Sequence, residues 1–487
     1  MRVDQMPATG YNIVQRVREE TKRGAGKKSE KGDPSFTSAQ VAGLINRYKG
    51  SRWHDRNHNG KTELTYAFST VKPRWFEEFN LGKRGQIEKI IPLSLPQQDF
   101  IRRAQQEYAD VANITFTEKA GGGGEGHLTY RGYTSRDEAS ADAGMGYTPG
   151  PYYPKQQGTI WMNNLDPDNL ASPEEAGFRD NYWRSVLIHE LGHGLGMAHP
   201  HSEENEKPEI PLYAEKSRNY SIMGYDLPIL SETQDTPHPV SLMLDDIQAI
   251  QSKYGANYST RKGNTTYGFN SNTNREHYSL KSSQEIPFFS VWDGGGWDTL
   301  DFSQFTQDQT INLNAGTFSS VGGLRDNVSI AHGVTVEEAR GGQGKNTLIG
   351  NAAFNILRGG RDRDILYGGS GGAQMWGGEG ADTFVFDATS SGKPNLVMDF
   401  VSGKDKIDLS GMRRQSGPLK LVSRLPLDRT KPQNPNNPTF ITQPGDVLVS
   451  YDRTGQQTLL RMDTTGDGKM DMQVYVRGKV AREDIVV

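Results

Sequence analysis

Apolar residues in the first half of the chain recur at the spacing of amphipathic helices. A helix is predicted from residue 37 or 38, where a Thr or Ser can cap the first turn, to residue 48. Its apolar face carries Val41, Leu44, Ile45 and Tyr48. A second helix is predicted from about residue 96 to residue 112, and a third from about residue 180 to residue 195.

Short runs of apolar and β-branched residues lie between these helices. They predict strands at residues 64–68, 114–117, 127–130 and 158–162. The alternation of strands and helices indicates a mixed sheet with helices packed against it. Residues 1–32 are polar and rich in Lys, Arg and Glu, so we expect them to be loosely ordered or to lie on the surface.

A period of nine residues marks the second half of the chain. Five consecutive blocks between residues 341 and 385 approximate the pattern G-G-x-G-x-D-x-U-x, and begin at Gly341, Gly350, Gly359, Gly368 and Gly377. The eighth position is always apolar, as Leu348, Leu357, Leu366, Met375 and Phe384. A flexible Gly-rich linker would show no such phase, so the repeat predicts a parallel β-roll with calcium in its turns.

The sixth position of each block should supply a calcium-binding carboxylate. It is occupied by Asn346, Asn355, Asp364, Ala373 and Asp382, so only two of the five blocks carry charge there. We therefore expect fewer or weaker calcium sites than a full repeat array gives. The calcium ligands predicted in this region are Gly342, Gly344, Asn346, Gly359, Asp364, Gly377, Gly378, Gly380 and Asp382, with Asp399 and Asp405 beyond the repeat.

The third predicted helix carries a pattern of metal ligands. His189 and His193 are four residues apart and lie on one helical face, where both can bind one tetrahedral zinc ion. Gly196 can take the left-handed conformation that ends the helix, so that His199 returns as a third ligand. Glu190 can then accept a proton from zinc-activated water. Chance would produce the full pattern in roughly a few chains per hundred thousand.

This extended motif resembles the metzincin signature, and Ser221-Ile222-Met223-Gly224-Tyr225 resembles the turn whose methionine underlies the zinc in that clan. The resemblance narrows to the serralysin zinc metalloproteases. It implies that Tyr225 is a further, displaceable zinc ligand that hydrogen-bonds the developing oxyanion. Serralysins usually read Met-Ser-Tyr-Trp here, whereas this chain reads Met-Gly-Tyr-Asp, which leaves the ligand set intact but changes the local turn.

The same resemblance implies an α+β metzincin catalytic domain followed by an all-β parallel β-roll and β-sandwich domain. We expect a short propeptide within residues 1–20, the catalytic domain at 21–256 and the calcium-binding domain at 257–487. Further calcium ligands carried over by position are Arg261, Gly263, Thr265, Asp293, Gly295, Gly296, Asp298, Thr335 and Glu337. In metzincins the strand before the zinc helix lies at the sheet edge, so Thr159, Ile160, Trp161 and Met162 either pair with substrate or are ordinary core.

Composition limits the function further. The chain has no Cys, which excludes disulfides and thiolate zinc ligands, and a net charge of -4 gives no reason to expect nucleic acid as a partner. Neither a membrane span nor an N-terminal signal peptide is predicted. By resemblance, the residues from Asp484 to Val487 form the uncleaved signal for a bacterial type I ABC exporter, which implies a secreted protein.

The sequence therefore predicts a secreted, calcium-stabilised zinc endopeptidase that acts on proteins. We expect it to be a monomer and to have a small protein inhibitor as a partner. Two alternatives stay open. One is a calcium-dependent adhesion or binding protein with an inactive peptidase domain, although all four motif residues are present. The other is a zinc hydrolase that acts on bonds other than peptide bonds.

Overall fold

The computed structural model describes residues 9–487 apart from 25, 30, 79–86, 120–125, 136–143, 164–181, 203–208, 228–237, 391 and 431–439. The chain separates into two compact units. The first holds residues 23–262 and 288–294, and the second holds the segment up to residue 22 together with 263–287 and 295–487. No helix in the described ranges is long and apolar enough to cross a membrane.

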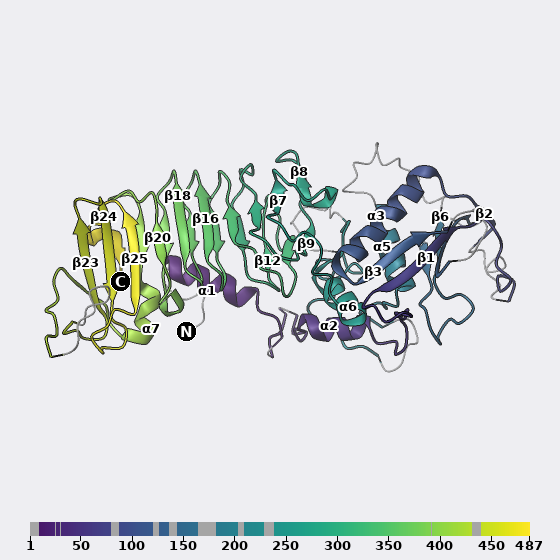
Figure 1. Ribbon diagram of the computed structural model, residues 1–487, viewed down its shortest axis with the longest axis horizontal. Helices are drawn as coiled ribbons and strands as arrows, with labels where there is room; N and C mark the ends of the chain where they lie inside the picture. The colour runs from purple at the N-terminus through teal and green to yellow at the C-terminus, as the bar shows by residue number, and fades with distance from the viewer. Residues whose placement is uncertain are drawn as a thin grey trace. The chain divides into compact units, whose positions relative to one another are not determined.

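The first unit is a mixed α/β domain. Its strands other than β9 form one sheet in the order β3-β1-β4-β6-β5, with β2 paired to β4. Strands β1, β3, β4 and β6 are parallel, whereas β5 and β2 run antiparallel to their neighbours. Helices α3 and α5 pack beside this sheet (Figure 1). The elements are α2 (Ser38–Ile45), β1 (Thr62–Phe68), β2 (Lys89–Ile91), α3 (Leu95–Val111), β3 (Ile114–Glu118), β4 (Leu128–Thr134), β5 (Gly144–Gly146), β6 (Thr159–Asn163), α5 (Tyr182–Gly194), α6 (Leu244–Tyr254) and β9 (Phe289–Val291).

The predicted helices and strands of this unit are present. Helices α2 and α3 each begin with a capping box, in which Thr37 and Ser94 accept from the backbone of Gln40 and Gln97. Helix α2 ends at Ile45, three residues before the predicted end, because Asn46 already leaves the helical conformation. The predicted start of α5 at residue 180 lies outside the described residues.

The prediction that the strand before the zinc helix forms the sheet edge is wrong. Strand β6 pairs with β4 on one side and with β5 on the other, so that Ile160 faces Gly146 and Met162 faces Gly144. Thr159, Ile160, Trp161 and Met162 are all buried. Their backbone groups are already paired within the sheet, so on this side an extended peptide would add to β5, the edge strand beside β6 in the described part of the chain.

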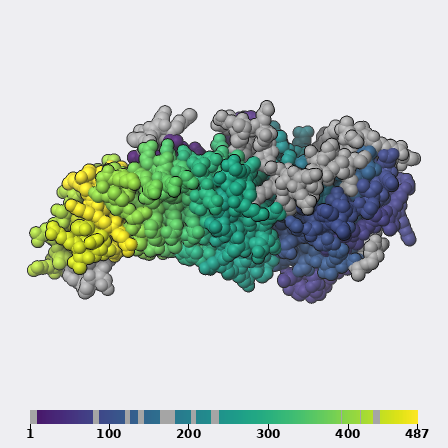
Figure 2. Space-filling view, turned by 90° about the horizontal axis from the view of Figure 1, so that it is seen from above, coloured from purple at the N-terminus to yellow at the C-terminus, as the bar shows by residue number. Residues whose placement is uncertain are grey.

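The second unit is the predicted β-roll. The strands of the nonapeptide blocks alternate between two parallel sheets, so a residue pairs with the one eighteen positions away, as Thr347 with Ile365 and Ile365 with Thr383. The apolar eighth positions of the repeat, Leu348, Leu357, Leu366, Met375 and Phe384, are completely buried between the sheets. Figure 2 shows the colours of this unit passing from teal through green to yellow, because every turn lies against the next in sequence.

The strands of the second unit include β7 (Thr266–Phe269), β8 (Ser279–Leu280), β10 (Thr299–Asp301), β11 (Gln309–Asn312), β12 (Phe318–Ser319), β13 (Val328–Ile330), β14 (Glu338–Arg340), β15 (Asn346–Ile349), β16 (Asn355–Gly360), β17 (Ile365–Tyr367), β18 (Ala373–Gly378), β19 (Thr383–Val385), β20 (Asn395–Val397), β21 (Lys406–Asp408), β22 (Lys420–Val422), β23 (Asp446–Asp452), β24 (Gln457–Met462), β25 (Met472–Arg477) and β26 (Ile485–Val486). A short helix, α7 (Arg413–Ser416), lies between β21 and β22. Strands β23, β24 and β25 are antiparallel and extend the sheet of β14, β16, β18 and β20.

Of the two expectations for the start of the chain, loosely ordered or lying on the surface, the second holds for residues 10–20, which form helix α1 (Gly10–Glu20) on the surface of the roll. Tyr11 and Val14 pack against Ile349, Tyr367 and Val385 of the roll, and Figure 1 shows α1 lying along the green strands. The backbone N–H of Tyr11 donates to Asp408 at 2.9 Å. The many charges of the segment conceal a single apolar face, and that face has a partner only in the folded roll.

Candidate metal centre

Three imidazoles converge at the end of helix α5. The Nε2 atom of His199 lies 2.9 Å from the Nε2 atoms of both His189 and His193. A tetrahedral ion with Zn–N bonds of about 2.0–2.1 Å requires nitrogen atoms only slightly farther apart. Among the described residues, no other group of three or more His, Asp or Glu side chains gathers its donor atoms within 4.8 Å. The donor set fits zinc.

The other nitrogen of two of these rings is fixed by a backbone carbonyl. Nδ1 of His189 lies 2.9 Å from the carbonyl oxygen of Ile222, and Nδ1 of His193 lies 2.8 Å from that of Met197. A carbonyl can only accept, so Nδ1 carries the hydrogen and Nε2 presents its lone pair. Contacts of this kind orient histidine ligands and set their tautomer.

Burial keeps His189 and His199 neutral, which is the form that binds a metal. It lowers the pKa of His189 well below its ordinary value, and the charges of His193 and His199 lower it further. Burial also lowers the pKa of His199, with smaller contributions from His193 and His201.

The turn that brings His199 back is built as predicted. Gly196 has a φ of +91°. A Cβ atom at this position would lie 2.0 Å from the carbonyl oxygen of Ser51, so only glycine fits. Below the helix, the buried Met223 lies against Gly192, where a Cβ atom would come within 2.7 Å of its sulfur.

Glu190 lies against strand β5, the edge of the sheet. A Cβ atom at Gly144 would lie 2.7 Å from Cγ of Glu190, and one at Gly146 would lie 2.3 Å from its backbone oxygen. The two glycines therefore allow the edge strand to approach the catalytic helix closely. This role of Gly144 and Gly146 was not predicted, because a glycine in a short strand indicates a close backbone approach but not which element approaches it.

Tyr225 completes the group. Its hydroxyl oxygen lies 3.0 Å from Nε2 of His199, and its ring is 52% exposed. Its ring centroid lies 4.5 Å from that of His199 and 4.5 Å from that of His201. The phenol thus borders the point on which the three imidazoles converge, on the solvent side.

A cavity of about 230 Å³ opens beside these residues. It is lined by Gly144, Tyr182, Ser185, Val186, His189, Glu190, Arg218, Ile222 and Tyr225. The guanidinium of Arg218 donates to the carbonyl of Gly224, the residue after Met223, at 2.9 Å. The cavity is large enough to hold an amino-acid side chain beside His189 and Glu190.

Asp246 is a site residue that the sequence analysis missed. This fully buried carboxylate of α6 accepts from the hydroxyl of Ser221 and from the backbone N–H groups of Ile222 and Met243, all at 2.7–2.9 Å. Burial raises its pKa to about 7. In the sequence, an acidic residue in the first turn of a helix looks like an ordinary helix-terminus residue. The contacts of Asp246 with Ser221 and Ile222 could therefore not be predicted.

Most of the predicted calcium ligands of the nonapeptide turns are buried in the roll, whereas Gly378 is exposed and Gly380 is half-buried. Asp364 and Asp382 are buried, and burial raises the pKa of Asp364 to about 8 and that of Asp382 to about 7. The Oδ2 atoms of both have no hydrogen-bond partner among the described residues. Asp399 accepts from Gly377 and Gly378, and Asp405 accepts from Asp382 and Val401.

The ligands predicted outside the repeat are only partly brought together. Asp298 accepts from the backbone N–H of Thr265 at 2.9 Å, and its own N–H donates to Glu337 at 2.7 Å. Gly263 accepts from the hydroxyl of Thr265, whereas Thr335 is exposed. Gly295 and Gly296 have φ values of +124° and +146°. Arg261 and Asp293 belong to the first unit, where Arg261 forms an ion pair with Asp110 at 2.7 Å.

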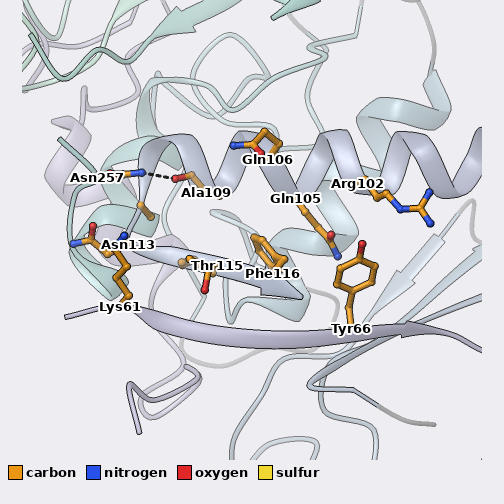
Figure 3. A pocket seen from close by; sticks show the side chains of 12 residues that line it. Lys61, Tyr66, Arg102, Gln105, Gln106, Ala109, Asn113, Thr115, Phe116 and Asn257 are labelled. Carbon is orange, nitrogen blue, oxygen red and sulfur yellow. Dashed lines mark hydrogen bonds between the residues drawn. The ribbon is translucent and has the colours of Figure 1, made fainter. Parts of the chain in front are cut away.

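A second cavity of the first unit, of about 440 Å³, lies between α3 and β3 (Figure 3). Its wall carries the amides of Gln105, Gln106, Asn113 and Asn257, and Asn257 donates to the carbonyl of Ala109 at 2.7 Å. No His, Asp or Glu is among its described lining residues. This cavity therefore offers neither a metal ligand nor a general base.

Comparison with known proteins places this site in a family. Residues 94–227 match the family model described as Matrixin, and residues 256–487 match Peptidase M10 serralysin C terminal. The chain is 40% identical to Metalloprotease AprA of Pseudomonas entomophila, over 99% of this chain and 96% of that protein. It is 42% identical to Metallopeptidase AprA of Pseudomonas marginalis (93% and 92% covered) and 38% identical to Serralysin A of Dickeya chrysanthemi (94% and 91%). With its metal-binding histidines, catalytic α/β unit and β-roll, the chain belongs to the serralysin family of zinc metalloendopeptidases.

Proposed function

We propose that this chain is a secreted, calcium-stabilised endopeptidase in which His189, His193, His199 and Tyr225 hold the zinc ion and Glu190 moves the proton. The observation that carries the proposal is the convergence of the three Nε2 atoms beside Glu190 and the edge strand β5. A substrate that adds to β5 as an extended strand would run past Glu190, with one side chain directed to the neighbouring cavity.

Each side chain has a defined task in peptide hydrolysis. Zinc, when bound, supplies the Lewis acidity that makes water a nucleophile near neutral pH. Glu190 accepts the proton of the attacking water and passes it to the leaving amine. The phenol of Tyr225 is a neutral hydrogen-bond donor, and its exposed position leaves it free to turn towards the oxygen of the scissile carbonyl. The catalytic residues therefore act without a covalent intermediate.

The family resemblance and the roll support the secretion and calcium parts of the proposal. Buried carboxylates of the roll suit calcium, a hard cation, and calcium is millimolar outside cells. We propose export through a type I ABC exporter that reads the residues from Asp484 to Val487. Asp484 is buried and accepts from Ser402 and Gly403, so the exporter would read this signal before the roll folds. We also propose that the chain is a monomer and that a small protein inhibitor binds it.

The propeptide proposal needs a narrower range than residues 1–20. Helix α1 begins at Gly10 and is bonded to the roll through Tyr11, and Thr9 caps it. Cleavage within 10–20 would break this contact, so we place the cut before Thr9. We keep the catalytic domain at 21–256 and the calcium-binding domain at 257–487 as proposed boundaries.

The test is casein hydrolysis by the purified chain before and after zinc removal with 1,10-phenanthroline, in millimolar calcium. We expect activity to vanish with zinc, to return when zinc is restored, and to be absent from Glu190→Gln at the same zinc content. If a folded, zinc-loaded chain cut before Thr9 shows no activity on casein or gelatin, the binding-protein alternative is favoured instead.

A further inference from the structure

The sixth positions of the nonapeptide blocks fall into two rows, because successive strands alternate between the two sheets. One row follows β15, β17 and β19 and consists of Asn346, Asp364 and Asp382, and Asp405, just before β21, continues it beyond the repeat. The other follows β16 and β18 and consists of Asn355 and Ala373, and Asn395 of β20 continues it beyond the repeat. The two rows differ in charge, since every carboxylate is in the first.

In the first row each carboxylate accepts from the backbone of the preceding turn. The N–H of Asn346 donates to Oδ1 of Asp364 at 2.7 Å, that of Asp364 to Asp382 at 2.9 Å, and that of Asp382 to Asp405 at 3.0 Å. The second oxygens of Asp364 and Asp382 are buried and have no hydrogen-bond partner within the described ranges. Buried carboxylate oxygens of this kind require a cation or a proton.

The turn at Asn346 is satisfied in a different way. Its Nδ2 donates to the carbonyl of Gly344 at 2.7 Å, to that of Gly342 at 3.3 Å and to Oδ1 of Asp364 at 2.8 Å. Its Oδ1 accepts from the backbone N–H of Gly342 at 3.0 Å and from Gln309 at 3.1 Å. Acceptors surround the nitrogen and donors surround the oxygen, so the orientation of the amide is fixed.

The asparagines of the second row also donate to backbone carbonyls, but the Oδ1 atom of Asn395 has no hydrogen-bond partner within the described residues. Nδ2 of Asn355 donates to the carbonyl of Glu337 at 3.2 Å, and Nδ2 of Asn395 donates to those of Ser390 and Lys393 at 3.0 and 3.1 Å. The side chain of Ala373 offers no ligand atom. In this row an amide or a methyl group therefore stands wherever the repeat would place a carboxylate.

We propose that calcium binding in the nonapeptide turns is confined to the turns of Asp364 and Asp382, and that the amide of Asn346 takes the place of the ion in the preceding turn. The amide supplies neutral N–H groups to the carbonyls of Gly342 and Gly344, which a calcium ion would otherwise contact. Gly342, Gly344 and Asn346 are thus removed from the predicted calcium ligands. This inference rests on the calcium part of the proposed function.

The test counts the calcium ions bound by the zinc-loaded full chain, by equilibrium dialysis, and compares variants. Asn346→Ala should bind as many ions as the wild type, but should melt at a lower temperature in chelator because buried carbonyls lose their donor. Asn346→Asp should bind one additional ion, and should be less stable than the wild type in chelator but not in millimolar calcium. Asp364→Asn, the matched exchange in the next turn, should bind fewer ions.

Three results would overturn the inference: a lower count for Asn346→Ala, an unchanged count for a folded Asn346→Asp, or an unchanged count for Asp364→Asn. The first result would show that Asn346 is a calcium ligand, and the second would show that its turn cannot hold an ion. A wild-type chain that binds no calcium would instead reject the calcium part of the proposed function, and this inference with it.

Discussion

Asp246 and His189 are joined through the two ends of one residue, Ile222. The carboxylate of Asp246 accepts the N–H of Ile222 at 2.7 Å, and the carbonyl oxygen of Ile222 lies 2.9 Å from Nδ1 of His189. The same carboxylate accepts from Ser221 and Met243. A buried carboxyl group on α6 thus fixes the backbone that orients a metal ligand.

Replacing Asp246 with Ala should therefore weaken zinc binding by about 10–100-fold, as is usual when a group that orients a metal ligand is lost. The measurement is competition with a chelator at a temperature where the variant is folded. Asp245→Ala is the matched control, because Asp245 neighbours it on α6 but pairs with Arg23 at 2.7 Å. Equal losses of zinc affinity in both variants would mean that Asp246 acts only through general stability.

Glu190→Gln should reduce kcat/KM by about 10²–10⁴-fold, because the amide cannot accept a proton. Zinc content should stay at the wild-type level, since Glu190 is not among the three converging ligands. Peptide hydrolysis and metal analysis on the same sample check both points. A variant that loses zinc together with activity would assign Glu190 a structural role instead.

Gly146→Ala should abolish most of the activity while leaving the zinc bound. Its Cβ atom would lie 2.3 Å from the backbone oxygen of Glu190 and 2.8 Å from Cβ of His193, so β5 would have to move away from the helix. Gly43→Ala is the control, since nothing lies within 4 Å of a Cβ atom there, and alanine in α2 should be neutral or stabilising by about 1 kcal/mol. Wild-type kinetics for Gly146→Ala would exclude a close approach of β5 to the catalytic helix.

The zinc-loaded chain without calcium should lose stability as the pH rises from about 4 to 8. The pKa values of Asp364 and Asp382 are raised from 3.8 to about 8 and about 7, so the folded chain binds more protons than the unfolded chain in this range. Melting temperatures in chelator between pH 5 and pH 8 measure the slope. The slope should shrink in Asp364→Asn, and an identical slope in that variant would assign the pH dependence to other groups.

Tyr11→Ala should destabilise the second unit by roughly 3–5 kcal/mol, as is typical for truncation of a buried aromatic residue. Tyr11 is only 7% exposed and packs in one cluster with Val14 and Tyr367. Denaturant unfolding followed by the circular dichroism of the β-sheets gives the change. Arg16→Ala on the exposed face of the same helix should have little effect, and a similar loss in both variants would contradict specific packing by Tyr11.

The parts of the fold that depend on local periodicity could be predicted from the sequence. The capped helices α2 and α3 and the alternation of the roll follow from residue spacing alone. The order of strands in the sheet could not be predicted, because the three-residue strand β5 has no apolar pattern and yet takes the edge position assigned to β6. Helix α1 was missed for a similar reason, since its apolar face is meaningful only against the roll.

The site shows the same division. His189, His193, Gly196 and His199 are close in sequence, and helical geometry brings them together. Asp246 reaches the site from another helix, and Gly144 and Gly146 reach it from another strand. The role of Asn346 depends on a carboxylate eighteen residues away, and becomes visible only when the roll stacks the two turns.

The contact between Tyr11 and Asp408 spans 397 residues. At a synthesis rate of 5–20 residues per second, about 20–80 s pass between the emergence of the two from the ribosome. During that interval α1 has no surface to cover, and an isolated helix of eleven residues is marginal in water. Helix α1 is therefore made long before Asp408, and it can fold onto the roll only after that residue has been made.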